Sequence, residues 1–93
     1  MLVYDLIKEK IPIITFVKKR ENNEFLIIEN TDLEIFYLND TAKDIINLCD
    51  GKNNIKSIIN TLNEMYDVDI HILQNDIIDL IRDFQWKKIL RLE

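Results

Sequence analysis

The chain has 93 residues, of which 47% are hydrophobic and 31% charged, and it carries a formal net charge of −5. This length supports one modest core, so we expect a single domain over residues 1–93, with the folded part at about 11–90. The hydrophobic content excludes a disordered tail, and no apolar stretch approaches the roughly 20 residues that cross a bilayer. A single Cys excludes an internal disulfide. We therefore expect a cytoplasmic protein without membrane contact.

The charges are distributed unevenly along the chain. Residues 21–86 contain fourteen acids against four bases, and the other bases lie before and after this range. A domain that binds duplex nucleic acid normally carries a basic stripe on the element that meets the phosphates. An acidic body would repel phosphate, so we expect no nucleic-acid partner.

Three short strands are predicted in the first half of the chain, at 11–18, 25–29 and 33–38. The first is rich in β-branched residues, and Pro12 suits the start of an edge strand, where a missing N–H costs little. Polar residues at 21–24 and 30–32 predict short turns between the strands. The pattern favours an antiparallel β-meander.

Three helices are predicted after the strands. Asn39 and Asn54 are good N-caps for the first two helices, and Gly51, the only Gly, lies where a helix end favours a left-handed residue. Asp67 or Asp69 ends the second helix and caps the third.

The third helix has apolar residues at helical spacing between Ile70 and Phe84, and residues 89–92 are expected to finish as a short extended segment. The order predicts an α+β fold: a winged helix-turn-helix-like domain, with a three-stranded antiparallel β-meander followed by three α-helices.

Few residues could carry catalysis. Cys49 lies on the apolar side of its helix and is expected to be a buried core residue, and the only His, His71, lies near a helix start. The run Asp67–His71 lacks the ligands and the glycine of a calcium loop and the donor set of a zinc site. No glycine-rich phosphate loop is present. We expect no enzyme activity, no cofactor and no metal.

The third predicted strand carries the better signal for binding, because it ends the meander and leaves an edge that an extended peptide could join. Phe36 and Leu38 alternate with Leu33, Ile35 and Tyr37. One set must face the helices, and the other would form an apolar groove beside the last helix. Two alternatives stay open: both sets lie in the core, or two chains pair through this edge as a homodimer.

Trp86, near the end of the last helix, is expected to cover the end of the core, with a role as an anchor for a partner as the alternative.

The stretch from Tyr37 to Asp69, followed by a long amphipathic helix, resembles the PqqD-like family of peptide-recognition domains. The pattern is a strand ending in Leu-Asn, then x-Thr-Ala-x-x-Ile, a helix closing in Asp-Gly, a helix with Ile-Ile-x-x-Leu, and an aromatic residue before Asp-Val-Asp. These positions are Leu38, Asn39, Thr41, Ala42, Ile45, Asp50, Gly51, Ile58, Ile59, Leu62, Tyr66, Asp67, Val68 and Asp69.

This resemblance implies a winged-helix domain that binds no DNA and recognises the leader segment of a ribosomally made precursor peptide. The leader would be added antiparallel to strand 33–38, in the groove beside the last helix. The domain would present the peptide to a modifying enzyme such as a radical SAM maturase, here as a stand-alone protein. The residues implied to face the leader are Leu33, Ile35, Tyr37, Leu73, Ile77 and Ile81.

Two other functions compete with peptide recognition. The same fold serves DNA-binding transcriptional regulators, whose affinity falls steeply with salt. A small dimerisation or regulatory subunit could also use the edge of strand 33–38.

Overall fold

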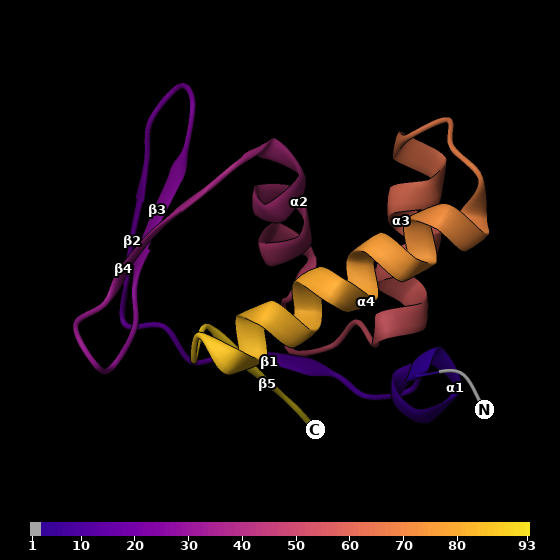
Figure 1. Cartoon of the computed structure of the whole chain (residues 1–93), viewed down its shortest axis with the longest axis horizontal. Helices are drawn as coiled ribbons and strands as arrows, with labels where there is room; N and C mark the ends of the chain where they lie inside the picture. Colours follow the sequence, from indigo (N-terminus) through magenta and orange to yellow (C-terminus); the bar gives the residue numbers. More distant parts are fainter. Residues whose placement is uncertain (1–2) are drawn as a thin grey trace.

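The computed structural model describes residues 3–93, and its elements form two small antiparallel sheets beside a group of helices (Figure 1). One sheet has the order β2-β3-β4 and the other pairs β1 with β5. In chain order the elements are α1 (Val3–Ile7), β1 (Pro12–Ile14), β2 (Lys18–Glu21), β3 (Leu26–Glu29), β4 (Ile35–Leu38), α2 (Asp40–Leu48), α3 (Ile55–Met65), α4 (Ile70–Trp86) and β5 (Leu90–Leu92). The expected α+β fold, with a three-stranded meander followed by three helices, is confirmed.

The first predicted strand, over 11–18, is wrong in extent. The chain forms β1 against β5, bends at residues 15–17, and only then enters the meander as β2. Thr15 marks the change of partner, because its backbone N–H donates to Ile89 O and its hydroxyl donates to Lys88 O. β2 could not be predicted as a separate strand, because its residues KKRE are all exposed and show no apolar alternation.

The meander has one buried face and one exposed face. Leu26 and Ile28 of β3 are 0% and 1% exposed, and Leu38 of β4 is 6% exposed. Side chains alternate along a strand, so Ile35 and Tyr37 lie on the opposite face. The predicted third strand begins two residues later than expected, because Leu33 adopts a left-handed conformation with φ 65° in the β3–β4 turn.

The helix caps follow the predictions from the sequence. Asn39 accepts a hydrogen bond from the N–H of Ala42, and Asn54 accepts one from Ser57. Asp69, rather than Asp67, caps α4 and accepts from the N–H groups of His71 and Ile72. Gly51 has the expected left-handed φ, 82°, two residues after the C-cap of α2.

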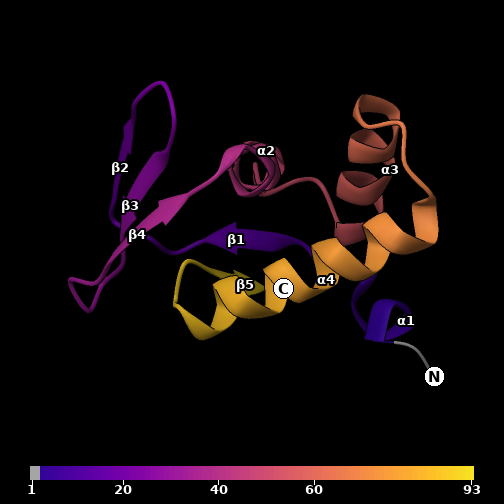
Figure 2. The same cartoon turned by 45° about the horizontal axis from the view of Figure 1, so that its top comes forward.

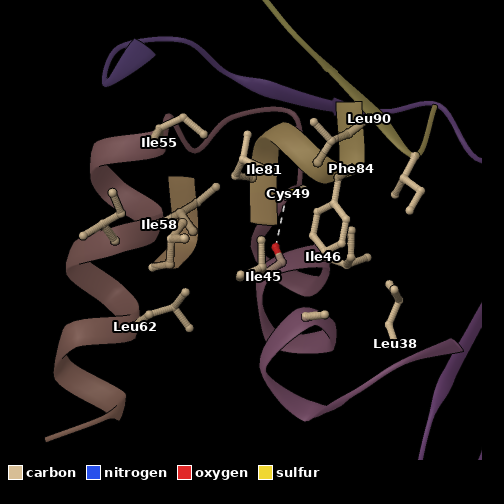
Figure 3. Close-up of a cluster of buried hydrophobic side chains, with 14 of the residues drawn as sticks. Leu38, Ile45, Ile46, Cys49, Ile55, Ile58, Leu62, Ile81, Phe84 and Leu90 are labelled. Atoms are coloured by element: carbon tan, nitrogen blue, oxygen red, sulfur yellow. Dashed lines mark hydrogen bonds between the residues drawn. The ribbon is translucent and has the colours of Figure 1, made fainter. Parts of the chain in front are cut away.

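The core lies where α2, α3 and α4 meet and extends to the inner face of the meander (Figure 3). Its largest fully buried side chain is Phe84, and all three helices contribute fully buried isoleucines to the same core. Helix α1, which the sequence analysis did not predict, contacts α4 and adds Tyr4 and Ile7 to the edge of this core. No helix of residues 3–93 is long and apolar enough to cross a membrane.

The expectation that Trp86 covers the end of the core is wrong, since its side chain is 87% exposed. Trp86 lies half a turn around α4 from the buried Ile77, so it points to solvent. Ile89 and Leu90, which are 0% and 2% exposed, close that end of the core instead.

Cys49 is buried as expected, and its thiol donates to the carbonyl of Ile45 (Figure 3). Burial, together with the nearby Asp50 carboxylate, raises the pKa of the Cys49 thiol to about 12. Only the thiolate reacts with alkylating reagents, so native protein at about pH 8 should react with iodoacetamide at least about 100-fold more slowly than urea-unfolded protein. Mass spectrometry of timed samples measures this, and equal rates would contradict the buried position.

The β3–β4 turn is fastened to the C-terminal end of α4 by Asn30, the one buried polar residue in the part of the chain that the structure describes. Its side-chain Nδ2 donates to the carboxylate of Glu34 at 3.0 Å and to the carbonyl of Lys87 at 2.8 Å. Its Oδ1 accepts from the N–H groups of Asp32 and Glu34. All the hydrogen-bonding capacity of this amide is therefore used.

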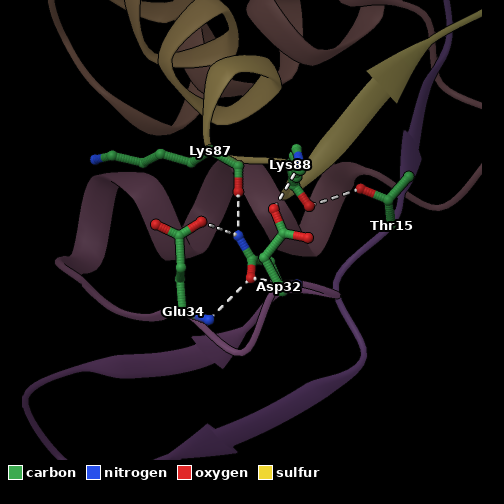
Figure 4. A network of polar contacts seen from close by, with 6 residues as sticks. Thr15, Asp32, Glu34, Lys87 and Lys88 are labelled. Atoms are coloured by element: carbon green, nitrogen blue, oxygen red, sulfur yellow. Dashed lines mark hydrogen bonds and ion pairs between the residues drawn. The ribbon is translucent and has the colours of Figure 1, made fainter.

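Lys88 adds an exposed ion pair with Asp32 across the same junction (Figure 4). Hydrogen bonding to this carboxylate raises the pKa of Lys88. The turn that leads into β4 is thus held at a defined position relative to α4.

Candidate functional site

Strand β4 has a free edge. It pairs only with β3 among the described strands, and it leads directly into α2 (Figure 2). Asn30 N–H donates to Glu34 O across the turn, so alternation along the ladder directs the backbone groups of Phe36 and Leu38 toward β3. The N–H and C=O groups of Ile35 and Tyr37 then point away from the sheet, where a further strand could pair with them.

An apolar pocket of about 240 Å³ lies beyond the C-terminal end of β4, between the start of α2, the α3–α4 loop and α4. We call it the α4 pocket. It is lined by Thr41, Tyr66, Val68, Ile72, Leu73, Asp76, Ile77 and Leu80. Thr41 follows the last residue of β4 by only three positions, so the free edge and the pocket are neighbours. Together they form the candidate site.

The six residues predicted to face a peptide fall into three groups. Ile35 and Tyr37 lie on the exposed side of β4, and Leu33 is 76% exposed in the turn before it. Leu73 and Ile77 line the α4 pocket. Ile81 is fully buried and lines neither the α4 pocket nor the exposed side of the sheet. The structure therefore places three of the six on exposed surfaces at β4 and the turn before it, and two, Leu73 and Ile77, as buried side chains beneath the α4 pocket, 7% and 0% exposed.

Several residues of the α4 pocket, chiefly Val68 and Ile72, were not predicted from the sequence. They are 48% and 62% exposed, although both are large and apolar. A signal was available, because the two residues lie four positions apart across the cap of α4, outside its buried stripe. Large apolar side chains in such a position are typical of a binding surface.

The polar groups near the pocket are mostly acidic. Asp76 lines it, and Tyr66 donates from its hydroxyl to the carboxylate of Asp44. Hydrogen bonding to Asp44 raises the pKa of the Tyr66 phenol, so this group stays neutral near pH 7. At the other end of α4, the ammonium of Lys87 lies 5.3 Å from the centre of the Phe36 ring, on the inner face of β4.

No group of three or more His, Cys, Asp or Glu side chains that could hold a metal ion occurs among residues 3–93. The arrangement offers instead a row of backbone donors and acceptors next to an apolar pocket. These are the features of a domain that binds an extended peptide by strand addition.

The comparisons with known proteins agree with this class. The family model for Coenzyme PQQ synthesis protein D (PqqD) matches residues 24–90. A solved structure of TbiB1 in complex with the TbiA(beta) leader peptide is similar in fold, with a TM-score of 0.76 and 18% sequence identity over 85% of this chain and 94% of that chain. No curated protein gives a match.

The family model covers the meander from its β2–β3 turn onward, all three helices that follow, and the start of β5. The chain belongs to the PqqD family.

Proposed function

We propose that this chain binds the leader segment of a ribosomally synthesised precursor peptide as an added strand on β4 and presents the peptide to a modifying enzyme. The observation that carries the proposal is the free edge of β4, where Ile35 and Tyr37 direct their N–H and C=O groups outward. Membership of the PqqD family supports it, as does the similar fold of TbiB1, which was solved with a leader peptide.

The bound leader would run antiparallel to β4. Its N-terminal part would then pass the C-terminal end of β4 and reach the α4 pocket near Thr41. Backbone pairing with Ile35 and Tyr37 would supply affinity that does not depend on sequence, and an apolar side chain in the α4 pocket would supply selectivity. Leu73 and Ile77 would form the floor of the pocket beneath this side chain, although Ile77 is as fully buried as Ile81, and Ile81 would support the helix from the core.

The charges near the site favour a particular kind of leader. Asp76 lines the α4 pocket, and the chain from residue 21 to residue 86 has a balance of −10. A leader with apolar anchors and basic residues between them would meet less repulsion than an acidic one.

The chain itself would perform no catalysis, and the chemistry would belong to the partner enzyme, which we propose to be a radical SAM maturase. Cys49, whose thiol is the most nucleophilic type of side chain in the chain, is buried in the core. A free thiol of this kind suits the reducing cytoplasm, where we propose that the protein works.

Titration calorimetry with the leader peptide encoded beside the gene should give one site per chain with a Kd near or below about 1 µM, or about −8 kcal/mol. The Ile72→Glu variant should bind at least about 10-fold more weakly, because it places a charge in the α4 pocket without disturbing a buried residue.

Two outcomes would count against this proposal. One is the absence of heat with any peptide encoded near the gene, with a scrambled leader as the control. The other is tight binding of duplex DNA that weakens steeply with salt, which would favour a regulator instead.

A further inference from the structure

We propose that the exposed face of the β2-β3-β4 sheet is the docking surface for the modifying enzyme, and that it accepts an acidic protein surface with an apolar centre. This inference rests on the proposed function, because it assumes that an enzyme must reach the bound peptide. The face lies on the side of the sheet away from the helices, and we call it the outer face.

The outer face has an apolar centre without a cover. Ile27 of β3 lies opposite Tyr37 of β4, and Ile35 is the next residue along β4 on the same side. Tyr37 is 66% exposed and Ile35 is 56% exposed. The ring of Phe25 packs edge-on against Tyr37, with 6.0 Å between the ring centres, and extends the apolar strip. A shallow hollow of about 480 Å³ lies over this centre.

Cations border the apolar centre on one side. The register places Lys18 opposite Glu29 and Arg20 opposite Ile27, so both cations lie on the outer face, and the Glu29 carboxylate lies there with them. Lys19, between the two, lies opposite the buried Ile28 and therefore belongs to the other face of the sheet. Within residues 3–93, Lys18 and Arg20 take part in none of the ion pairs.

These cations also stand out against the charge of the protein, which is −5. Lysine and arginine beside exposed aromatic and aliphatic side chains form a surface that complements carboxylates around an apolar patch. The partner is therefore expected to present such a patch. Duplex nucleic acid fits less well, because the acidic remainder of the chain would repel the flanking phosphates.

The outer face is continuous with the site proposed for the leader. A strand added to β4 would become the fourth strand of this sheet, about 4.8 Å from β4. Every second side chain of the leader would then stand on the outer face beside Ile35 and Tyr37. An enzyme docked there would contact the domain and the leader together. Its affinity should therefore be higher for the loaded chain, and by linkage the leader should bind more tightly in its presence.

The test compares two charge reversals that change the net charge equally. Lys18→Glu/Arg20→Glu alters the outer face, and Lys52→Glu/Lys56→Glu alters exposed cations near the start of α3. Each variant is titrated, by biolayer interferometry, against the purified modifying enzyme encoded beside the gene, with and without saturating leader. Leader affinity is measured separately by calorimetry.

The first variant should bind the enzyme at least about 20-fold more weakly than wild type, and the second within about twofold, with leader affinity unchanged in both. Saturating leader should raise the affinity of wild type for the enzyme at least about fivefold.

Several results would overturn this proposal. Equal enzyme binding by the two variants, no enzyme binding by wild type, or no effect of the leader would each contradict it. A homodimer in light scattering that only the first variant disrupts would assign the face to a second copy of the chain. Failure of leader binding in calorimetry would instead contradict the proposed function, because enzyme docking is measured without leader as well.

Discussion

Replacing Tyr37 by proline should abolish leader binding while the domain stays folded. The N–H of Tyr37 points to the free edge of β4, so its loss removes no hydrogen bond within the sheet. A leader strand added to β4, in contrast, would lose the N–H donor of residue 37 and would clash with the proline ring. We expect binding to weaken at least about 100-fold in calorimetry, with the free energy of unfolding changed by less than about 1.5 kcal/mol.

Two controls separate backbone pairing from side-chain contact. Phe36→Pro removes an N–H that bonds to β3, so it should destabilise the domain by about 3 kcal/mol or more in urea unfolding. Tyr37→Ala keeps the N–H and should weaken leader binding by far less than Tyr37→Pro. If Tyr37→Pro bound the leader as well as wild type, the peptide would not be held by strand addition at β4.

Asn30→Ala should cost about 2–4 kcal/mol of stability in urea unfolding. The buried amide accepts two hydrogen bonds from backbone N–H groups and donates two, to the Lys87 carbonyl and the Glu34 carboxylate. Alanine removes all four bonds and leaves these groups without their partner. The variant should also bind the leader more weakly, since the turn into β4 would no longer be fastened to α4.

Asn22→Ala is the matched control, since Asn22 also accepts two backbone hydrogen bonds in a turn of the same sheet. These bonds come from Glu24 and Phe25, and Asn22 is exposed. The Asn22→Ala variant should lower the free energy of unfolding by only about 1 kcal/mol and leave leader affinity unchanged. Equal effects of the two substitutions would mean that Asn30 acts only as a turn residue.

The elements with strong local signals were predictable from the sequence. The caps at Asn39, Asn54 and Asp69, and the apolar spacing of α4, depend on residues close in the chain, and each is confirmed. The free edge was also expected, because short turns favour a meander and a meander leaves its last strand unpaired on one side.

The parts that depend on distant residues were not predictable. The bend at Thr15 exists because β1 pairs with β5, which lies more than seventy residues later in the chain. The burial of Ile81, against the exposure of Ile72, depends on how α4 rotates toward the core. The role of Asn30 follows from its bond to Lys87, 57 residues away, whereas the local sequence Asn-Thr-Asp indicates only a turn.

The short length of β4 has a consequence for timing. Only Ile35 and Tyr37 direct backbone groups to the free edge, so an added strand gains about four ladder hydrogen bonds there. With a Kd near 1 µM and an association rate of about 10⁵–10⁷ M⁻¹s⁻¹, dissociation would occur at about 0.1–10 s⁻¹. A modified peptide could then leave within seconds, and one copy of the domain could serve many peptides in succession.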